Sequence, residues 1–297
     1  MQQVEKLNTS KIQSIVDKVH DLPTPPIVFT QIIKAINDPN TPIEKLAKII
    51  SEDPAITAKI LKLTNSAFYG IPKTVANINE AIKIIGLEAV KSLVVSTSVF
   101  GMFSKNKNIC NDYLESFWRH SLLTGFMAKI LVSIIKVDTF EEAEMSFLAG
   151  LLHDIGKLII AINMEKEYAE IESIMTNDKS LTAADAETKV LEFTHADIGE
   201  YLLNEWNIPD QVGNSVLYHH DSRIVETQPK VALIHIADYL SHEMEVVDGC
   251  PQNYLPPSEK TWNLLGLDSH RQADFISLLR EQYNKAETFM EMTQGID

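Results

Sequence analysis

The chain of 297 residues is long enough for one large domain or two modest ones, and its composition, 45% hydrophobic and 23% charged, is that of an ordinary globular protein. A formal net charge of -15 argues against nucleic acid or an anionic membrane as a partner of the whole surface, because phosphates are bound by clustered Lys and Arg. Cys110 and Cys250 form no disulfide framework, and no apolar run reaches the roughly 18 residues of a membrane span. We therefore expect a soluble, cytoplasmic protein.

Helical periodicity runs through nearly all of the sequence, beginning with an amphipathic pattern over residues 1–20 that lacks the apolar stretch of a signal peptide. Three later helix starts carry their own signals. Residues 41–44, TPIE, have the pattern of a capping box with proline at the first helical position, and residues 53–54, DP, form a similar start. Asn77 followed by Glu80 forms a third. These features predict an all-α protein of roughly a dozen short helices.

A polar, basic stretch at 101–112, GMFSKNKNICND, separates two helical blocks and is the best candidate boundary. It divides the chain into an N-terminal helical subdomain, residues 1–104, and a second subdomain, residues 105–297. A long loop is expected at 248–260, DGCPQNYLPPSEK. The amphipathic segment after it, residues 258–297, either closes a site or forms a homodimer.

Three ionisable residues, His153, Asp154 and Lys157, interrupt the apolar stretch GLLHDIGKLII at 150–160. Plotted as one helix at about 100° per residue, they fall opposite the apolar stripe. This side is either the solvent-exposed face of an amphipathic helix or the wall of a site. The small residues Gly150 and Ala161 share it, which leaves room for a ligand or for a closely packed helix.

Four further helical segments place ionisable side chains on apolar faces: His120, His195, His219 with His220 beside it, and Asp238. A lone histidine on such a face is usually a core residue with a hydrogen-bond partner, and a lone buried aspartate needs a donor. A single site at which all of them converge with the HD pair at 153–154 explains them together. Imidazole nitrogens and carboxylates bind divalent Fe, Mn, Zn, Co or Ni. The sequence therefore predicts a site for one or two divalent ions, where two ions bridged by an aspartate could activate water and hold a phosphoryl group.

The order of these residues, H…HD…H…HH…D, resembles the HD metal-dependent phosphohydrolase superfamily. HDIGK and the paired histidines are similar to its HD-GYP branch of two-metal phosphodiesterases, although the following residues, HHDSRIVETQP, lack the GYP motif. The resemblance implies a catalytic role for Asp154, as the bridging ligand, and for Lys157, which would lie near substrate phosphate. It also implies two metal-binding groups: His120, His153, Asp154 and Asp238 for one ion, and His195, His219 and His220 for the other.

The N-terminal half resembles the HDOD domain, through the opening LPTPP, the block DPAITAKILKLTNSAFYG and the block AIKIIG. This resemblance covers roughly residues 15–245. It implies an all-α fold in which an N-terminal helical subdomain packs on an HD-like helical bundle, and a signalling or regulatory role.

Two functions are therefore expected. The first is a regulatory protein whose intact HD-type metal site acts through a ligand or through signalling protein partners. The alternative is an active metal-dependent phosphohydrolase or phosphodiesterase, with a nucleotide or another phosphorylated small molecule as its substrate.

Overall fold

A computed structural model describes residues 19, 23–38, 40–66, 69–104, 110–135, 140–247 and 254–294 of the chain. Within these ranges the ordered elements are helices and no strand occurs, which confirms the all-α prediction. The helix predicted over residues 1–20 lies outside the described residues, apart from Val19, as does much of the loop predicted at 248–260. Residues 105–109, inside the predicted subdomain boundary, also lie outside them, and the division at 104 stays a prediction.

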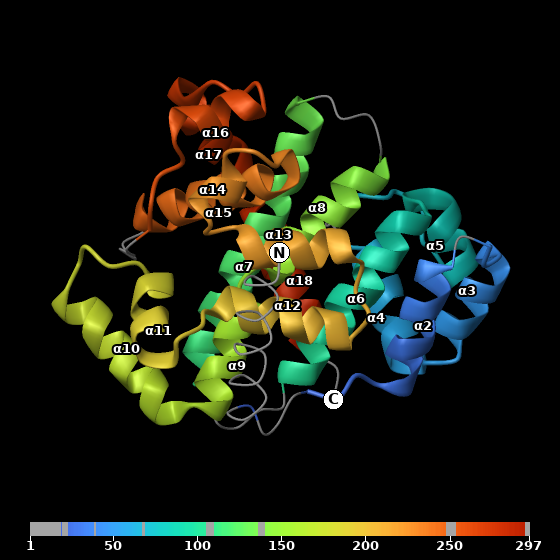
Figure 1. Ribbon diagram of the computed structural model, residues 1–297. Helices are drawn as coiled ribbons and strands as arrows, with labels where there is room; N and C mark the ends of the chain where they lie inside the picture. Colours follow the sequence, from blue (N-terminus) through green and yellow to red (C-terminus); the bar gives the residue numbers. More distant parts are fainter. Residues whose placement is uncertain are drawn as a thin grey trace.

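The first helices form a group of their own at one side of the molecule, the blue and cyan part at the right of Figure 1. They are α2 (Ile27–Asn37), α3 (Ile43–Ser51), α4 (Pro54–Thr64), α5 (Ile78–Ile85) and α6 (Leu87–Phe103). The chain bends by 119° between α5 and α6. Gly86 makes this bend, with a positive φ of 90° that other residues rarely adopt.

Two of the three predicted helix starts are confirmed. Asp53 and Asn77 each accept a hydrogen bond, at 2.9 Å, from the backbone N–H three residues further on. The predicted capping box at 41–44 is wrong. The Thr41 hydroxyl donates to Asp38 instead, at 3.1 Å, and Pro42 precedes the helix rather than opening it.

The second part of the chain is a bundle built around α7 (Asn111–Ile134), which packs along α8 (Phe140–Leu152) and α15 (Pro229–Val247). Close approach of α7 and α8 depends on glycine, because a Cβ added to Gly150 would lie 2.8 Å from the backbone of Gly125. The remaining helices of this part are α9 (Ile155–Asn163), α10 (Glu165–Asn177), α11 (Ala183–Leu191), α12 (His195–Glu205), α13 (Asp210–Tyr218) and α14 (Ser222–Val225).

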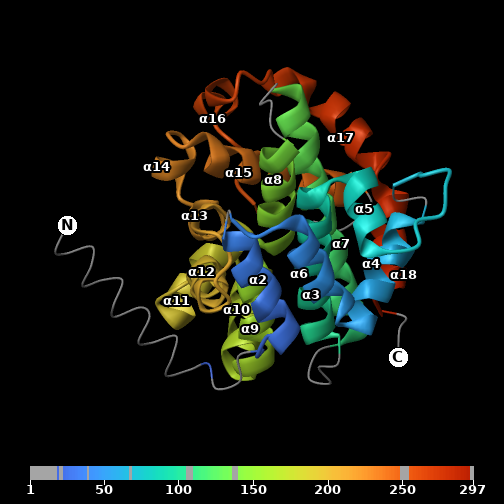
Figure 2. The ribbon, with the colours of Figure 1, turned by 90° about the vertical axis from the view of Figure 1, so that its right-hand side faces the viewer.

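The C-terminal helices are α16 (Glu259–Leu264), the short 3₁₀ helix η1 (Ser269–Arg271), α17 (Gln272–Arg280) and α18 (Tyr283–Gln294). They pack within the same chain, where α17 contacts α7 and α15, and α18 contacts α4, α6 and α7. In Figure 2, α17 and α18 run down one side of the molecule beside α7 and α4. The last helix therefore joins the N-terminal helices to the bundle.

One segment, Glu142–Asn163, is long and apolar enough to cross a membrane by length and composition. It spans most of α8 and all of α9, and 78% of its apolar window is buried inside the fold. Such burial is expected of the core helices of a soluble protein.

Candidate metal centre

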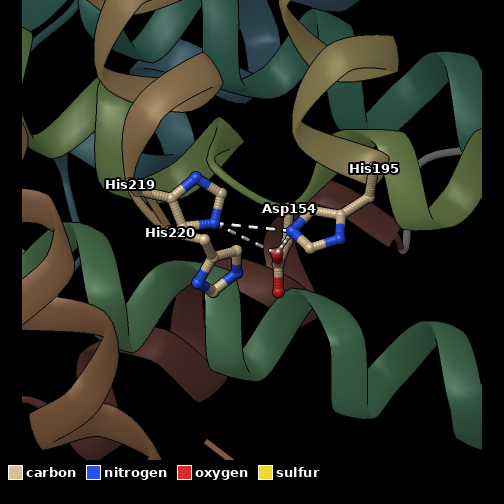
Figure 3. Close-up of side chains that lie close together, drawn as sticks. All are labelled: Asp154, His195, His219 and His220. Carbon is tan, nitrogen blue, oxygen red and sulfur yellow. Dashed lines mark hydrogen bonds and ion pairs between the residues drawn. The ribbon is translucent and has the colours of Figure 1, made fainter. Parts of the chain in front are cut away.

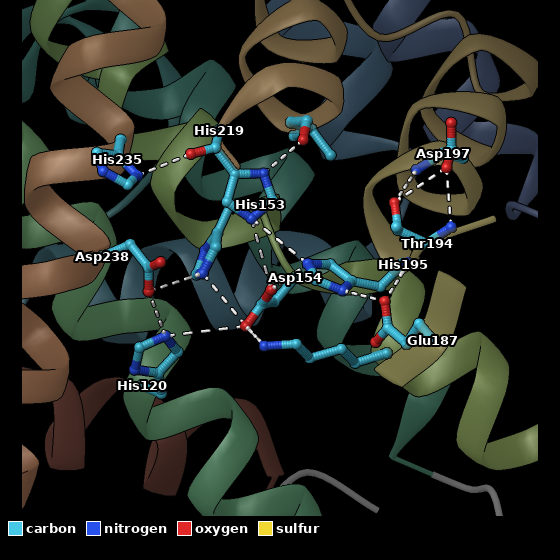
Figure 4. A network of polar contacts seen from close by, with 12 residues as sticks. His120, His153, Asp154, Glu187, Thr194, His195, Asp197, His219, His235 and Asp238 are labelled. Atoms are coloured by element: carbon cyan, nitrogen blue, oxygen red, sulfur yellow. Dashed lines mark hydrogen bonds and ion pairs between the residues drawn. The ribbon is translucent and has the colours of Figure 1, made fainter. Parts of the chain in front are cut away.

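The structure brings the seven predicted ligand residues together where six helices meet (Figures 3 and 4). They come from α7 (His120), the junction of α8 and α9 (His153 and Asp154), the first residue of α12 (His195), the end of α13 (His219 and His220) and the middle of α15 (Asp238). All are buried except His220, which is exposed.

The HD pair lies at a break between two helices, so the prediction of one continuous helix over 150–160 is wrong. The backbone at Asp154 has φ −102° and ψ 6°, outside the helical range, and α9 starts at the next residue. The polar face is not solvent-exposed, since His153 and Asp154 are at most 2% exposed. Gly150 does not leave room for a ligand. It lets α7 pack closely instead, which is the second of the two alternatives predicted for the small residues on this face.

A second glycine positions α12 against the centre. A Cβ added to Gly156, in the first turn of α9, would lie 2.0 Å from the carbonyl oxygen of His195. Only glycine therefore allows the first residue of α12 to lie this close to the HD junction.

The first group of ligands consists of His120, His153 and Asp238, each of which offers an atom within 4.8 Å of the others. Asp238 Oδ1 lies 3.1 Å from His120 Nε2 and 3.4 Å from His153 Nε2. Asp154 Oδ2 extends toward the same two nitrogens, at 3.9 Å from His120 Nε2 and 3.3 Å from His153 Nε2. Asp154 thus borders this group.

The second group consists of Asp154, His195, His219 and His220 (Figure 3). Asp154 Oδ1 lies 3.1 Å from His195 Nε2 and 3.8 Å from His219 Nε2, and the two Nε2 atoms are 3.5 Å apart. The two carboxylate oxygens of Asp154 therefore face different groups of ligands, as a bridging carboxylate requires.

Backbone carbonyls fix the proton positions on two of the histidines. His153 Nδ1 lies 2.7 Å from the carbonyl oxygen of Gly150, and His219 Nδ1 lies 2.6 Å from that of Val216. Because a carbonyl only accepts, each Nδ1 carries a hydrogen and donates it. In the neutral rings the lone pair is then on Nε2, which faces the cluster as a metal ligand must.

Carboxylates face the outer nitrogens of the other two buried histidines. Glu187 Oε2 accepts from His195 Nδ1 at 2.7 Å and from the His195 backbone N–H at 2.8 Å. Glu245 Oε2 lies 3.3 Å from His120 Nδ1. Outer carboxylates of this kind orient metal-binding histidines and raise their basicity.

The two aspartates of the centre are held in the ionised form. Burial acts to raise the pKa of Asp154, but His153 and Lys157 outweigh it and hold this pKa well below its ordinary value. Burial likewise acts to raise the pKa of Asp238, and His242 with His120 holds it well below. Two buried negative charges among imidazoles form a donor set suited to a divalent cation.

The histidines differ in their affinity for a proton. Burial acts to lower the pKa of His120, but Glu245 outweighs it and raises the pKa to about 10. In the same way, Glu187 outweighs burial and raises the pKa of His195 to about 9. Burial lowers the pKa of His219 to about 4, so this ring is neutral at pH 7. An ion bound here would displace protons from His120 and His195.

The donor set also passes a test for fit to a metal. His153 Nε2 and Asp154 Oδ1 are buried, and neither forms a hydrogen bond with any residue that the structure describes. Buried polar atoms are rarely left in this state. Both atoms point into the cluster, where a cation would satisfy them.

A pocket of about 340 Å³ adjoins the centre and is walled by α7, α9, α10, α11 and α15. His120 and Asp154 line its inner end, together with Lys157, whose ammonium lies 2.6 Å from Asp154 Oδ2. Tyr113 and Tyr168 also line it, with their rings edge to face and 5.9 Å apart. A small molecule in this pocket would contact the predicted ligands directly.

Three further residues border the centre that were not predicted from the sequence: Glu187, His242 and Glu245. His242 and Glu245 follow Asp238 at i+4 and i+7, which is a detectable signal, since these positions share one helix face. Glu187 is buried on the same face of α11 as Leu191, but nothing in its local sequence marks it as a site residue.

A family model described as HDOD domain matches residues 22–222. A protein of uncharacterised function from Treponema pallidum (strain Nichols) is 26% identical over 259 residues, which is 86% of this chain and 48% of that protein. The chain thus spans about half the length of this relative.

Two solved structures share the fold. A candidate phosphohydrolase from Shewanella amazonensis SB2B has a TM-score of 0.73 at 19% identity, covering 94% of this chain and 98% of that one. A candidate signal transduction protein from Marinobacter aquaeolei VT8 has a TM-score of 0.75 at 17% identity, covering 97% of this chain and 66% of that one. At these identities the likeness establishes the architecture alone.

Proposed function

Because this chain belongs to the HDOD domain family and carries a complete set of HD-type ligands, we propose that it is a metal-dependent phosphohydrolase acting on a small phosphoester. One observation carries the proposal. The Nε2 atoms of the buried histidines face two ionised aspartates, and the protons of His153 and His219 are held on the opposite side of each ring.

In this proposal each ion has its own group of ligands. His120, His153 and Asp238 would hold the first, and His195, His219 and His220 would hold the second. Asp154 would bridge the two, because its oxygens face different groups. Divalent ions held in this way lower the pKa of water and withdraw charge from a phosphoryl oxygen.

The chain's own contribution is to bind the phosphoester and to exclude water. Lys157 lines the pocket and is tied to Asp154, so its charge lies where a phosphoryl group next to the ligands would be. Tyr113, Tyr168 and Met175 line the same pocket and would cover an apolar or aromatic part of the substrate. The volume of about 340 Å³ lies at the small end of ligand sites, which favours a mononucleotide or a similar phosphoester over a dinucleotide.

A second candidate is a regulatory role through protein partners. Among the large apolar side chains exposed in the described part of the chain, Ile27, Ile43 and Ile84 lie on the N-terminal helices, at 78%, 46% and 42% exposure. Exposed apolar residues favour protein contacts, with a signalling partner or with a second copy of the chain. The solved structure named for signal transduction has the same fold, which agrees with this role.

Metal analysis and turnover assays distinguish the two proposed functions. Protein purified without chelator is expected to contain up to two Fe, Mn, Zn, Co or Ni ions per chain. With metal added, it should hydrolyse p-nitrophenyl phosphate, bis-p-nitrophenyl phosphate or a nucleoside monophosphate. Asp154→Asn should abolish turnover, whereas the control Asp178→Asn, at an exposed turn, should not.

The metal centre and the hydrolase activity are tested separately. Protein that binds no metal would refute the proposed metal centre. Stoichiometric metal with no turnover that depends on Asp154 overturns the hydrolase and leaves the regulatory role. In that case Ile27→Ser with Ile84→Ser should reduce partner binding or self-association at unchanged metal content, and unchanged association would count against those residues.

A further inference from the structure

A second cavity, of about 410 Å³, shares no lining residue with the pocket beside the metal centre. Its walls come from α6 of the N-terminal helices, from α7 and α8 of the bundle, and from the start of α18. Both α8 and α18 pack on α6 and on α7. The cavity therefore lies between the N-terminal helices and the bundle, and its volume is within the range of small-molecule sites.

One lining residue, Ser92, has a buried hydroxyl that forms no hydrogen bond with any residue that the structure describes. It is 5% exposed. Ser96 and Thr97, further along α6, donate to the carbonyl four residues earlier, at 2.7 Å and 2.8 Å, as hydroxyls within a helix usually do. Buried hydroxyls are rarely left without a partner, so Ser92 favours a polar group inside the cavity.

Two further polar side chains of the lining, the amide of Gln282 and the ammonium of Lys285, are half-buried. Neither has a hydrogen-bond or ion-pair partner within the described part of the chain. Together with Ser92 they give the cavity one cation and two hydrogen-bond donors whose partners are not supplied by those residues.

The charges of the lining favour an anion. Glu144 is buried at 4% exposure, and the Lys129 ammonium donates to its carboxylate, so this negative charge is already compensated. With Lys285, the described lining holds two ammonium groups against one carboxylate. This local excess of positive charge occurs in a chain with a formal net charge of -15. A charge-assisted hydrogen bond from Lys285 to an anionic ligand would be among the strong ones.

The same cavity has an aromatic wall. Phe126 and Phe147 line it with rings whose centroids are 5.4 Å apart and whose planes are inclined by 49°. The two residues are 7% and 4% exposed, so they are held in place by the surrounding helices. Aromatic side chains of this kind pack well against a second ring.

We propose that this cavity binds a small aromatic acid, with its anionic group on Lys285, Gln282 and Ser92 and its ring against Phe126 and Phe147. The site goes beyond the proposed hydrolase and does not depend on a bound metal. A ligand there would contact α6, α7, α8 and α18 at once, so it should raise the temperature of unfolding as its concentration increases.

Two bromine-labelled probes test the site: 4-bromobenzoate and 4-bromophenylphosphonate. Crystals of the full chain grown with each probe should show an anomalous bromine peak beside Phe126 and Phe147. Calorimetry should show which acid binds more tightly, and this distinguishes a carboxylate ligand from a phosphate ligand.

Variants connect binding in solution to this cavity. Lys285→Ala should weaken binding of the tighter probe by about tenfold or more, because a charge-assisted hydrogen bond is lost. Ser92→Ala should weaken it by about fivefold. Lys260→Ala is the matched control, since it removes the same charge from an exposed residue that pairs with Glu226, and it should bind the probe as wild type does.

Several results would overturn the proposal. They are a cavity that holds only ordered water, a bromine peak only beside Lys157, and a Lys285→Ala protein that binds the probe with wild-type affinity. A bromine peak without measurable binding in solution, which is occupancy at crystal concentration only, would overturn it too. None of these measurements requires metal, so this site and the proposed hydrolase can fail independently.

Discussion

One methyl group added at Gly156 is expected to disable the second half of the metal centre. The Cβ of an alanine there would lie 2.0 Å from the carbonyl oxygen of His195 and 3.0 Å from the backbone nitrogen of Gly199. Since Cβ atoms essentially never approach another heavy atom closer than 3.0 Å, α9 and α12 would have to separate by about 1 Å at His195. Both contacts are with backbone, so no side-chain rotation relieves them.

A displacement of about 1 Å exceeds the roughly 0.5 Å within which a site tolerates misplaced ligands. We therefore expect Gly156→Ala to weaken the second metal by about 10–100-fold and to cost about 1–3 kcal/mol of stability through overpacking. The first ion should be retained, because its ligands His120 and Asp238 lie on α7 and α15. Stoichiometry after dialysis against a series of metal concentrations measures the first effect, and thermal unfolding measures the second.

Gly213→Ala is the matched control. Gly213 lies on α13, the helix that ends at His219, but the nearest atom to its added Cβ is 3.8 Å away, an ordinary contact. This variant should keep both ions and unfold at or slightly above the wild-type temperature, because alanine favours a helix over glycine. A Gly156→Ala protein that binds both ions with wild-type affinity would refute the role assigned to this helix contact.

Three further predictions concern charge in the centre. Lys157→Ala removes the ammonium 2.6 Å from Asp154, a cation that competes with metal for this carboxylate. Metal affinity should therefore rise, while turnover falls about 10²-fold because the charge that binds the phosphoryl group is lost. A fall in both metal affinity and turnover would contradict a substrate-binding role for Lys157. Glu187→Gln removes the carboxylate that orients His195, so the affinity for the second metal should fall by about tenfold in a metal titration. An unchanged affinity would show that this outer carboxylate is dispensable. Because the pKa of His120 is raised to about 10, a metal that binds below that pH must displace the proton of His120. The affinity for the first metal should therefore increase about tenfold per pH unit from pH 7 to 9. Calorimetry in buffers of different ionisation enthalpy should detect the released proton, and an affinity that does not change with pH would contradict the assignment.

The fold class and the predicted ligands could be derived from the sequence because both depend on local patterns. Helical periodicity is visible in almost every segment, and a histidine such as His120 or an aspartate such as Asp238 is conspicuous on an apolar helix face. The roles of the outer carboxylates could not be derived in this way. Glu187 contacts His195 only because α11 packs against the start of α12, which is a tertiary relation.

The helix break at the HD pair was missed for a related reason. Neither His153 nor Asp154 is a helix breaker, and the apolar pattern continues on both sides of the pair, so periodicity predicts one helix. The break leaves His153 Nδ1 to donate to the Gly150 carbonyl and turns Asp154 toward both ligand groups. Gly150 was likewise ambiguous, because a small residue beside a polar face serves a cavity and a close helix contact equally well.

The two halves of the centre differ in how they are held, and this predicts the order in which the ions leave. His120 and Asp238 lie in the interiors of the two longest helices of the bundle, α7 and α15, and both are buried. His195 is instead the first residue of α12, and His219 and His220 follow the last turn of α13, where His220 is exposed. Helix ends open locally more readily than helix interiors, and an exposed ligand is more easily reached by water or by a chelator. A gradual chelator titration should therefore remove the second ion first, and His220→Ala should lower the chelator concentration needed for that step alone. Simultaneous loss of both ions, or earlier loss of the first, would show that helix position does not control retention.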